Sequence, residues 1–130
     1  MAKKLELYKC ETCGIITQII IPGEGTLECC DKEMELLVPH TDEMLGEKHV
    51  PVFKKTEDGG AEIIVGSIPH PMTEEHYIMF IEKISEDRNF MKLKYLHPGD
   101  EPKMKLMKEH KNASANTYCN IHGFWESKND

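Results

Sequence analysis

The sequence predicts a mainly β protein, in which a small cysteine-rich metal-binding domain is followed by an antiparallel β-sandwich. Two observations support this fold class. Four of the five cysteines lie within the first thirty residues, and the chain after position 38 consists of short runs in which apolar and polar residues alternate. Alternation with a period of two is typical of strands that bury one face. We therefore divide the chain into residues 1–37 and residues 38–130.

The composition disfavours several function classes. The 130 residues include 23 acidic and 16 basic side chains, for a formal net charge of −7, and no stretch is basic enough to neutralise nucleic-acid phosphates. The longest apolar cluster, IITQIII, is too short to span a bilayer. The basic start MAKK is followed by LELYKCETC, which is not the apolar run of an export signal. We expect a cytoplasmic protein that binds neither nucleic acid nor membrane, and whose clustered cysteines bind metal.

The first domain is too short to fold by apolar burial alone. A unit below about 40 residues usually needs a metal, disulfides or a partner chain. The segment VPHTDEMLGE, residues 38–47, is interpreted as a connection to the second domain. We therefore expect a metal in the first domain and a homodimer in which two copies of this domain pack together.

The four early cysteines predict the first metal site. Cys10 and Cys13 form a C-x-x-C turn, and the adjacent pair Cys29 and Cys30 follows after fifteen residues. Such a turn points two thiolates at one ion, and Gly14 allows backbone N–H groups to approach the sulfurs. Two pairs make a closed tetrahedral sulfur site that suits zinc or iron, and the spacing leaves both open. The adjacent pair is expected to distort the angle at the metal, and a redox dithiol is disfavoured because no thioredoxin-like βαβ pattern surrounds the turn.

Seven short runs predict seven strands in the second domain. In one of them Met91, Leu93 and Tyr95 alternate with two lysines, the pattern of a half-buried strand. EDGG, SEDRN and HPGDEP supply turn residues between runs, and no long amphipathic helix is evident. Seven strands in about ninety residues are typical of an immunoglobulin-like sandwich. The runs span residues 49–55, 61–67, 76–84, 89–97, 103–109, 113–119 and 123–127.

The lone late cysteine and four of the seven histidines predict a second metal site. CNIH places Cys119 and His122 on either side of a two-residue gap, as in a C-x-x-C turn. His70 and His76 bracket the tight loop HPMTEEH, and His49 begins a predicted strand. A sandwich can bring these three segments to one end, where they supply four imidazoles and one thiolate.

Five ligands exceed the four of a relaxed zinc site. They suit five-coordinate iron with one open position, analogous to a haem with an axial thiolate. Two alternatives remain: blue copper, disfavoured because HGFWESKND contains no methionine, and a buried free cysteine among scattered histidines. We interpret His40, His97 and His110 as ordinary surface or structural residues, because each lies in or beside a charged or turn segment without a paired ligand.

Two charged residues precede His49 directly. In isolation Glu47 and Lys48 would be solvated loop charges. Beside an open metal position, Lys48 offers local positive charge that attracts a small anion to a protein whose overall field repels one. Glu47 is placed to cap the vacant position and to leave when a substrate arrives.

Five motifs, in this order, resemble the family of desulfoferrodoxin, the two-iron form of superoxide reductase. They are YKCETCG, the CC pair, GEKHVPV, PHPMTEEHYI and YCNIHGFW, which extend from Cys10 to Trp125. The resemblance implies that residues 1–37 form a desulforedoxin-like domain whose iron is held by the four early cysteines. It implies that residues 38–130 form an immunoglobulin-like catalytic domain with a second mononuclear iron. One-iron relatives lack the first cysteine set, so its completeness here indicates the two-iron class.

The resemblance also implies an activity. A superoxide reductase reduces superoxide by one electron to hydrogen peroxide and is re-reduced by an external donor, for which the family suggests rubredoxin. A rubredoxin-like electron carrier and a zinc-stabilised binding module are the alternatives from other function classes. The implied roles are His49, His70, His76 and His122 as equatorial ligands, Cys119 as axial ligand, Glu47 as sixth ligand in the oxidised state and Lys48 as cationic helper.

Overall fold

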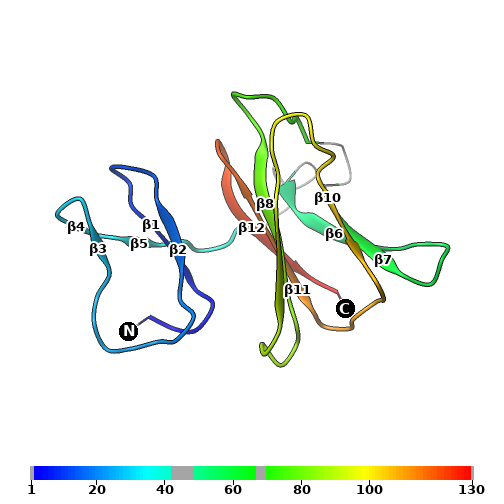
Figure 1. Cartoon of the computed structure of the whole chain (residues 1–130), viewed down its shortest axis with the longest axis horizontal. Helices are drawn as coiled ribbons and strands as arrows, with labels where there is room; N and C mark the ends of the chain where they lie inside the picture. Colours follow the sequence, from blue (N-terminus) through cyan, green and yellow to red (C-terminus); the bar gives the residue numbers. More distant parts are fainter. Residues whose placement is uncertain (1, 42–48, 67–69, 130) are drawn as a thin grey trace. The chain divides into compact units, whose positions relative to one another are not determined.

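The computed structural model describes residues 2–41, 49–66 and 70–129. Within these ranges every element with defined bounds is a β-strand, so the mainly β prediction is confirmed. The contacts divide the chain into two units, Met1–Val38 and Pro39–Asp130 (Figure 1). The described residues contain no helix with the length and hydropathy that a membrane span requires.

The first unit contains two small antiparallel sheets. In the larger one, β1 (Leu7–Lys9) lies between β2 (Ile16–Gln18) and β5 (Glu35–Leu36). In the smaller one, β3 (Glu28–Cys29) pairs with β4 (Lys32–Glu33) as a tight hairpin. These strands of two or three residues are shorter than typical strands, and their ladders alone cannot hold a fold.

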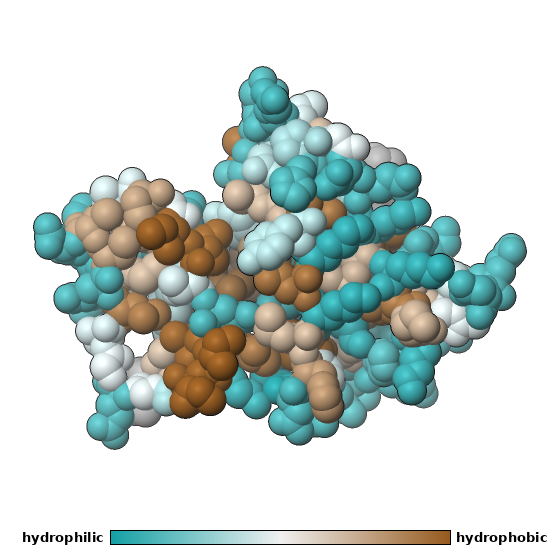
Figure 2. Space-filling view, viewed as in Figure 1, coloured by the Kyte–Doolittle hydropathy of each residue, from teal (hydrophilic) through white to brown (hydrophobic). Residues whose placement is uncertain are grey.

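This unit buries little apolar surface. Leu7 and Cys10 are the only hydrophobic residues in its described part that are fully buried. Figure 2 shows hydrophobic side chains on its surface instead. So small a core cannot offset the conformational entropy of the chain, which agrees with the expectation of a metal or a partner. The exposed large side chains are Ile15, Ile20, Ile21, Leu36 and Val38.

The second unit is a sandwich of a three-stranded and a four-stranded sheet (Figure 1). The strand orders are β10-β7-β6 and β12-β11-β8-β9, and every pairing is antiparallel. The predicted sandwich of seven strands is confirmed, although His49 lies two residues before its strand instead of beginning it. The bounds are β6 Pro51–Lys55, β7 Ala61–Val65, β8 Ile78–Ile84, β9 Met91–Tyr95, β10 Lys103–Leu106, β11 Ser114–Cys119 and β12 Gly123–Lys128.

The core lies between the two sheets and includes the thiol of the last cysteine. Strand β11 is buried along its whole length, and Cys119 at its end is completely inaccessible to solvent. Apolar side chains from both sheets surround it, among them Ile63 of β7 and Ile81 of β8, which are also 0% exposed. The predicted second metal site therefore lies at one end of a packed core, which holds the strands beside it rigidly.

The strand β9 turns its apolar face outward. The alternating pattern predicts that its apolar residues are buried, but all three are at least 37% exposed. Its lysines instead reach the facing sheet, where Lys92 Nζ donates to Lys105 O and Lys94 Nζ to Lys103 O, both at 3.0 Å. β10 is an edge strand, and the lysines satisfy carbonyl groups that no neighbouring strand reaches. The half-buried prediction was wrong here, because alternation separates two faces without saying which one meets the core.

The packing predicts the effect of truncating a core side chain. Ile81→Ala should lower the free energy of unfolding of the sandwich by about 3 kcal/mol, because the removed atoms lose their burial and leave a cavity. Val52→Ala is the matched control, since Val52 lies on β6 and is already 38% exposed. Urea denaturation followed by tryptophan fluorescence measures both. Equal losses for the two variants would contradict this description of the core.

Candidate metal centres

The four cysteines of the first unit converge on one point. The sulfur atoms of Cys10, Cys13, Cys29 and Cys30 lie within 4.8 Å of one another. The Sγ–Sγ distance is 3.5 Å between Cys13 and Cys29, and 3.9 Å between Cys29 and Cys30. Four thiolates at 2.3 Å from one ion form a tetrahedron with edges of about 3.8 Å. The cluster therefore fits a tetrahedral ion, and the Sγ–Sγ distance of the adjacent pair is close to the edge of such a tetrahedron.

The C-x-x-C turn stabilises its first thiolate. The Gly14 N–H donates to Cys10 O at 2.8 Å, and the Cys13 N–H points at Cys10 Sγ at 3.5 Å. Gly14 has φ +87°, in the left-handed region that costs glycine no strain. The Cys13 N–H is the main cause that lowers the pKa of Cys10 to about 6. The turn thus prepares a thiolate ligand near neutral pH.

A two-residue turn brings the adjacent cysteines to the same side. In an extended strand neighbouring side chains point to opposite faces. Here Cys30 and Asp31 form the turn between β3 and β4, with φ of 54° and 61°. Both central residues of a type I′ turn have positive φ, and this turn matches the twist of the flanking strands. The reversal of the chain at Cys30 allows both sulfurs to approach one ion.

The second cluster joins three segments of the sandwich. One ligand atom from each of its five residues lies within 4.8 Å of all the others. The segments are the residue before β6, the loop before β8 and the hairpin between β11 and β12. The structure therefore brings together the five residues that the sequence analysis combined: His49, His70, His76, Cys119 and His122.

The four imidazoles form a square. Neighbouring ring centroids are 4.8 Å apart for His49 and His70, 4.6 Å for His70 and His76, 5.0 Å for His76 and His122, and 4.5 Å for His122 and His49. A planar square with a side of 4.7 Å has a diagonal of 1.41 × 4.7, or about 6.6 Å, and the observed distance between the ring centroids of His49 and His76 is 6.4 Å. A square of four rings excludes the tetrahedral geometry of structural zinc and matches an equatorial plane.

The distances and the chemistry of the donor atoms fit a metal ion. Two nitrogens at 2.1 Å from one ion and at a right angle lie about 3.0 Å apart, and His49 Nε2 is 3.0 Å from His122 Nδ1. The His70 Nδ1–H donates to Pro71 O at 2.6 Å, while its Nε2 is buried without a hydrogen-bond partner. Burial is the main cause that lowers the pKa of His70 to about 4, so the ring is neutral. A neutral imidazole oriented by a carbonyl and with a buried free nitrogen is the form that metals bind.

The thiol of Cys119 is oriented by its own hairpin. The His122 N–H donates to Cys119 Sγ at 3.4 Å, and the same sulfur is 3.9 Å from His122 Nδ1. The C-x-x-H turn therefore uses the same N–H to sulfur contact as the C-x-x-C turn of the first unit. Cys119 lies in the core, whereas His76 and His122 are only partly buried, so within the described residues the more exposed side of the square faces away from the sulfur.

Asn120 connects two of the ligand segments, and the sequence analysis assigned it no role. Its Oδ1 accepts from the Tyr77 N–H at 3.0 Å, and its Nδ2 donates to Glu75 O at 3.1 Å. Its own N–H donates to Tyr77 O at 3.2 Å. These contacts fix the loop that carries His76 against the hairpin that carries Cys119. Asn120 lies between the predicted ligands Cys119 and His122 in the sequence, and this position was the signal that could have indicated its role.

Two further supporting residues were missed. The ring of Trp125 stacks on His49 with centroids 5.0 Å apart, and its Nε1–H donates to His122 O at 3.1 Å. The Thr117 hydroxyl donates to His49 O at 3.1 Å. Partners of this kind hold ligand rings in place. Both residues lie on the two strands that the CNIH segment connects. This motif was therefore the signal that could have indicated them.

The remaining candidates lie elsewhere. Glu47 and Lys48 fall outside the described residues. The three histidines interpreted as ordinary belong to neither cluster. The His40 N–H donates to Phe124 O beside β12, His97 Nδ1 lies 3.4 Å from Asp100, and His110 contacts a lysine.

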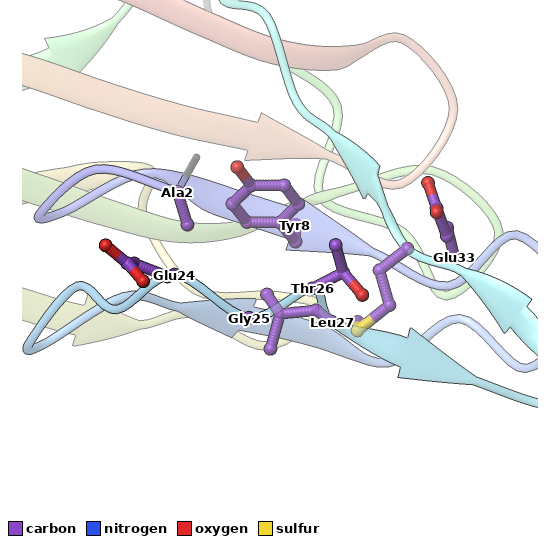
Figure 3. Close-up of a pocket in the computed structure, with 8 residues that line it drawn as sticks. Ala2, Tyr8, Glu24, Gly25, Thr26, Leu27 and Glu33 are labelled. Carbon is purple, nitrogen blue, oxygen red and sulfur yellow. The ribbon is translucent and has the colours of Figure 1, made fainter.

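A separate cavity of about 150 Å³ lies in the first unit (Figure 3). The ring of Tyr8 and the side chain of Leu27 border it, and it carries the carboxylates of Glu24 and Glu33. No cysteine and no basic side chain is among the described residues that line it. Such a cavity repels anions, and it offers none of the ligands found in the two clusters.

Comparisons with known proteins agree with both units. Residues 2–37 match the family described as "Desulfoferrodoxin, N-terminal domain", and residues 41–128 match the family described as "Desulfoferrodoxin". The desulfoferrodoxin of Desulfarculus baarsii is 41% identical over 129 residues, which is 99% of this chain and 100% of the relative. The superoxide reductase of Pyrococcus abyssi is 38% identical over 99 residues, which covers 64% of this chain and 86% of the relative.

A solved structure shows the same fold. The crystal structure of the superoxide reductase from Treponema pallidum aligns with a TM-score of 0.69 and 23% identity, covering 98% of this chain and 100% of that one. The family matches together cover both cysteine and histidine clusters in their order along the chain. The chain therefore belongs to the desulfoferrodoxin family.

Proposed function

We propose that this protein is a superoxide reductase, which reduces superoxide by one electron to hydrogen peroxide and is then re-reduced by an external donor. The observation that carries the proposal is the square of four imidazoles with a buried thiolate on one side. This arrangement leaves one coordination position for a small ligand. Relatives that are named superoxide reductase support the same activity.

The ligand sets assign two mononuclear irons to two domains. Residues 1–37 would form the desulforedoxin-like domain, and residues 38–130 the catalytic sandwich. When bound, the second iron supplies one electron and an open coordination position. The first iron would be held by Cys10, Cys13, Cys29 and Cys30, and the second by His49, His70, His76, His122 and Cys119.

The chain's own residues hold this site in its reactive form. The Pro71 carbonyl keeps the proton of His70 on Nδ1, so that Nε2 is available as a ligand. The His122 N–H stabilises negative charge on the sulfur of Cys119, and the core excludes water from that sulfur. A small anion therefore approaches from the opposite side of the imidazole square.

The charged pair before His49 would act on that side. Lys48 would attract superoxide and stabilise negative charge as it develops, and Glu47 would occupy the open position until the donor returns an electron. Both residues lie outside the described part of the chain, so their support comes from their place in the sequence beside a ligand.

Loss of a ligand from the second site should affect that site and leave the first one intact. Cys119→Ala and His122→Ala should abolish superoxide reduction, because each removes a ligand that no neighbour replaces, and should leave the absorption of the tetrathiolate iron intact. Metal analysis with stopped-flow mixing against superoxide measures both properties. Retained activity would show that the substituted residue is not a ligand of the site.

The unsubstituted protein distinguishes the alternative functions. Colourless protein that contains only zinc would support the binding module, and electron transfer without consumption of superoxide would support the electron carrier.

Lys48→Ile should slow the encounter with superoxide and weaken its dependence on ionic strength, because a steering charge acts on the association rate. Lys54→Ile is the matched control, since Lys54 is an exposed lysine on β6. Stopped-flow traces at several salt concentrations give the rate for each variant. A second-order rate that does not change in Lys48→Ile would reject the steering role.

The donor and the location follow from the chemistry. A reductase that does not dismutate needs a supply of electrons, and we propose rubredoxin or a similar small redox protein as the donor. We place the protein in the cytoplasm, where its five cysteines remain free of disulfides.

We also propose a homodimer formed through the first unit, because more of its large apolar side chains are exposed to solvent than are buried in its core. Sedimentation should give about twice the chain mass of 14.9 kDa. Ile20→Lys with Ile21→Lys should shift the equilibrium toward the monomer, whereas Val52→Lys on the sandwich should not. A monomer for the unsubstituted protein at all concentrations would contradict the proposal.

A further inference from the structure

A lysine inside the sandwich contacts a histidine that has no role at the metal centres. Lys83 lies on β8, opposite Ala115 of β11, in the row of side chains that faces the second sheet. Its Nζ is 2.7 Å from His110 Nδ1. Ala115 is four residues from Cys119 along β11, so this pair lies well apart from the second metal cluster.

The position of the histidine is fixed by the end of the chain. Asn129 Nδ2 donates to His110 O at 2.9 Å, and the Asn112 N–H donates to Asn129 O at 2.6 Å. Burial, followed by the charges of Lys83 and Lys108, lowers the pKa of His110. The ring is therefore neutral at physiological pH, and its Nδ1 accepts a hydrogen bond from the N–H of Lys83.

Two more lysines lie close to this pair. Burial is the main cause that lowers the pKa of Lys83, and the charges of Lys92 and Lys108 lower it further. Within the described ranges none of these three lysines forms an ion pair with a carboxylate. Other lysines of the sandwich do: Lys55 with Glu109, Lys103 with Glu101 and Lys105 with Asp58.

We propose that Lys83 is a site of acylation by acyl phosphates, with His110 as the base and Lys92 and Lys108 as the groups that attract the phosphate. A lysine nitrogen in direct contact with an imidazole base, here at 2.7 Å, is the arrangement of an activated nitrogen nucleophile. Neighbouring ammonium groups favour anionic electrophiles over uncharged ones. The inference does not depend on the superoxide chemistry.

The reaction balances without a further reactant. Lys83 reacts in its unprotonated form: the lone pair of Nζ attacks the acyl carbon, and the bond from that carbon to the phosphate oxygen breaks. Phosphate leaves with the electron pair of the broken bond. The proton lost from the amine passes to His110 Nδ1 and then to solvent. The product is an amide on Lys83 and free inorganic phosphate.

The proposal is tested on the full-length, iron-loaded protein with acetyl phosphate. Peptide mass spectrometry over time should show Lys83 acetylated about tenfold faster than the ion-paired Lys55, Lys103 and Lys105, although those are more exposed. Equal or slower acetylation of Lys83 would overturn the proposal, and this comparison requires no variant.

Two variants separate the roles of the neighbours. His110→Asn keeps a hydrogen-bonding group near Lys83 but cannot take the proton at neutral pH, so acetylation of Lys83 should slow about tenfold while Lys55 is unaffected. Lys92→Gln with Lys108→Gln should slow the reaction with acetyl phosphate more than that with uncharged phenyl acetate. Unchanged rates in either variant would reject the corresponding role. Superoxide reduction should be unchanged in both, which verifies that the variants are folded.

Discussion

The buried sulfur of Cys119 is the constraint on which the catalytic unit depends. Its side chain is 0% exposed, and the imidazole nitrogens that approach it include a buried one without a hydrogen-bond partner. Burial of polar groups without partners costs free energy unless something else satisfies them. A metal ion satisfies all of these atoms at once. The need to bring them to one point explains why a loop, a hairpin and a strand entrance meet at the same end of the sandwich.

The two centres use the same local device with different results. In each centre, two ligand residues are separated by two other residues, and the backbone N–H of the second ligand points at the sulfur of the first. The Cys13 N–H points at Cys10 Sγ, and the His122 N–H points at Cys119 Sγ. In the first unit the set is completed by two more thiolates at tetrahedral spacing, which closes the ion to further ligands. In the second unit a square of rings leaves one side open. The same turn therefore serves a closed site and a reactive one.

The two units differ in what stabilises them. The first has two buried hydrophobic residues in its described part, which are too few to hold a fold without a metal or a partner. The sandwich has a packed core that would hold its strands without metal. Rigid strands hold the ligand side chains in place, which would reduce reorganisation at a bound iron. Asn120 and Trp125 extend this support to the parts of the site that are not in strands.

Most of the fold and all of the ligand grouping could be predicted from the sequence. The seven strands follow from local alternation, and each ligand pair follows from local spacing, because both are properties of short segments; the second cluster also requires that a sandwich brings three such segments to one end. The tertiary structure alone decided which face of β9 turns toward the other sheet: its lysines donate to carbonyl groups of β10, although all five residues of the strand remain exposed. It also decided the left-handed turn at Cys30, the hydrogen bonds of Asn120 to the loop that carries His76, and the contact of Lys83 with His110. These depend on contacts between residues distant in the chain or on the course of the backbone, which the pattern of residue types does not specify.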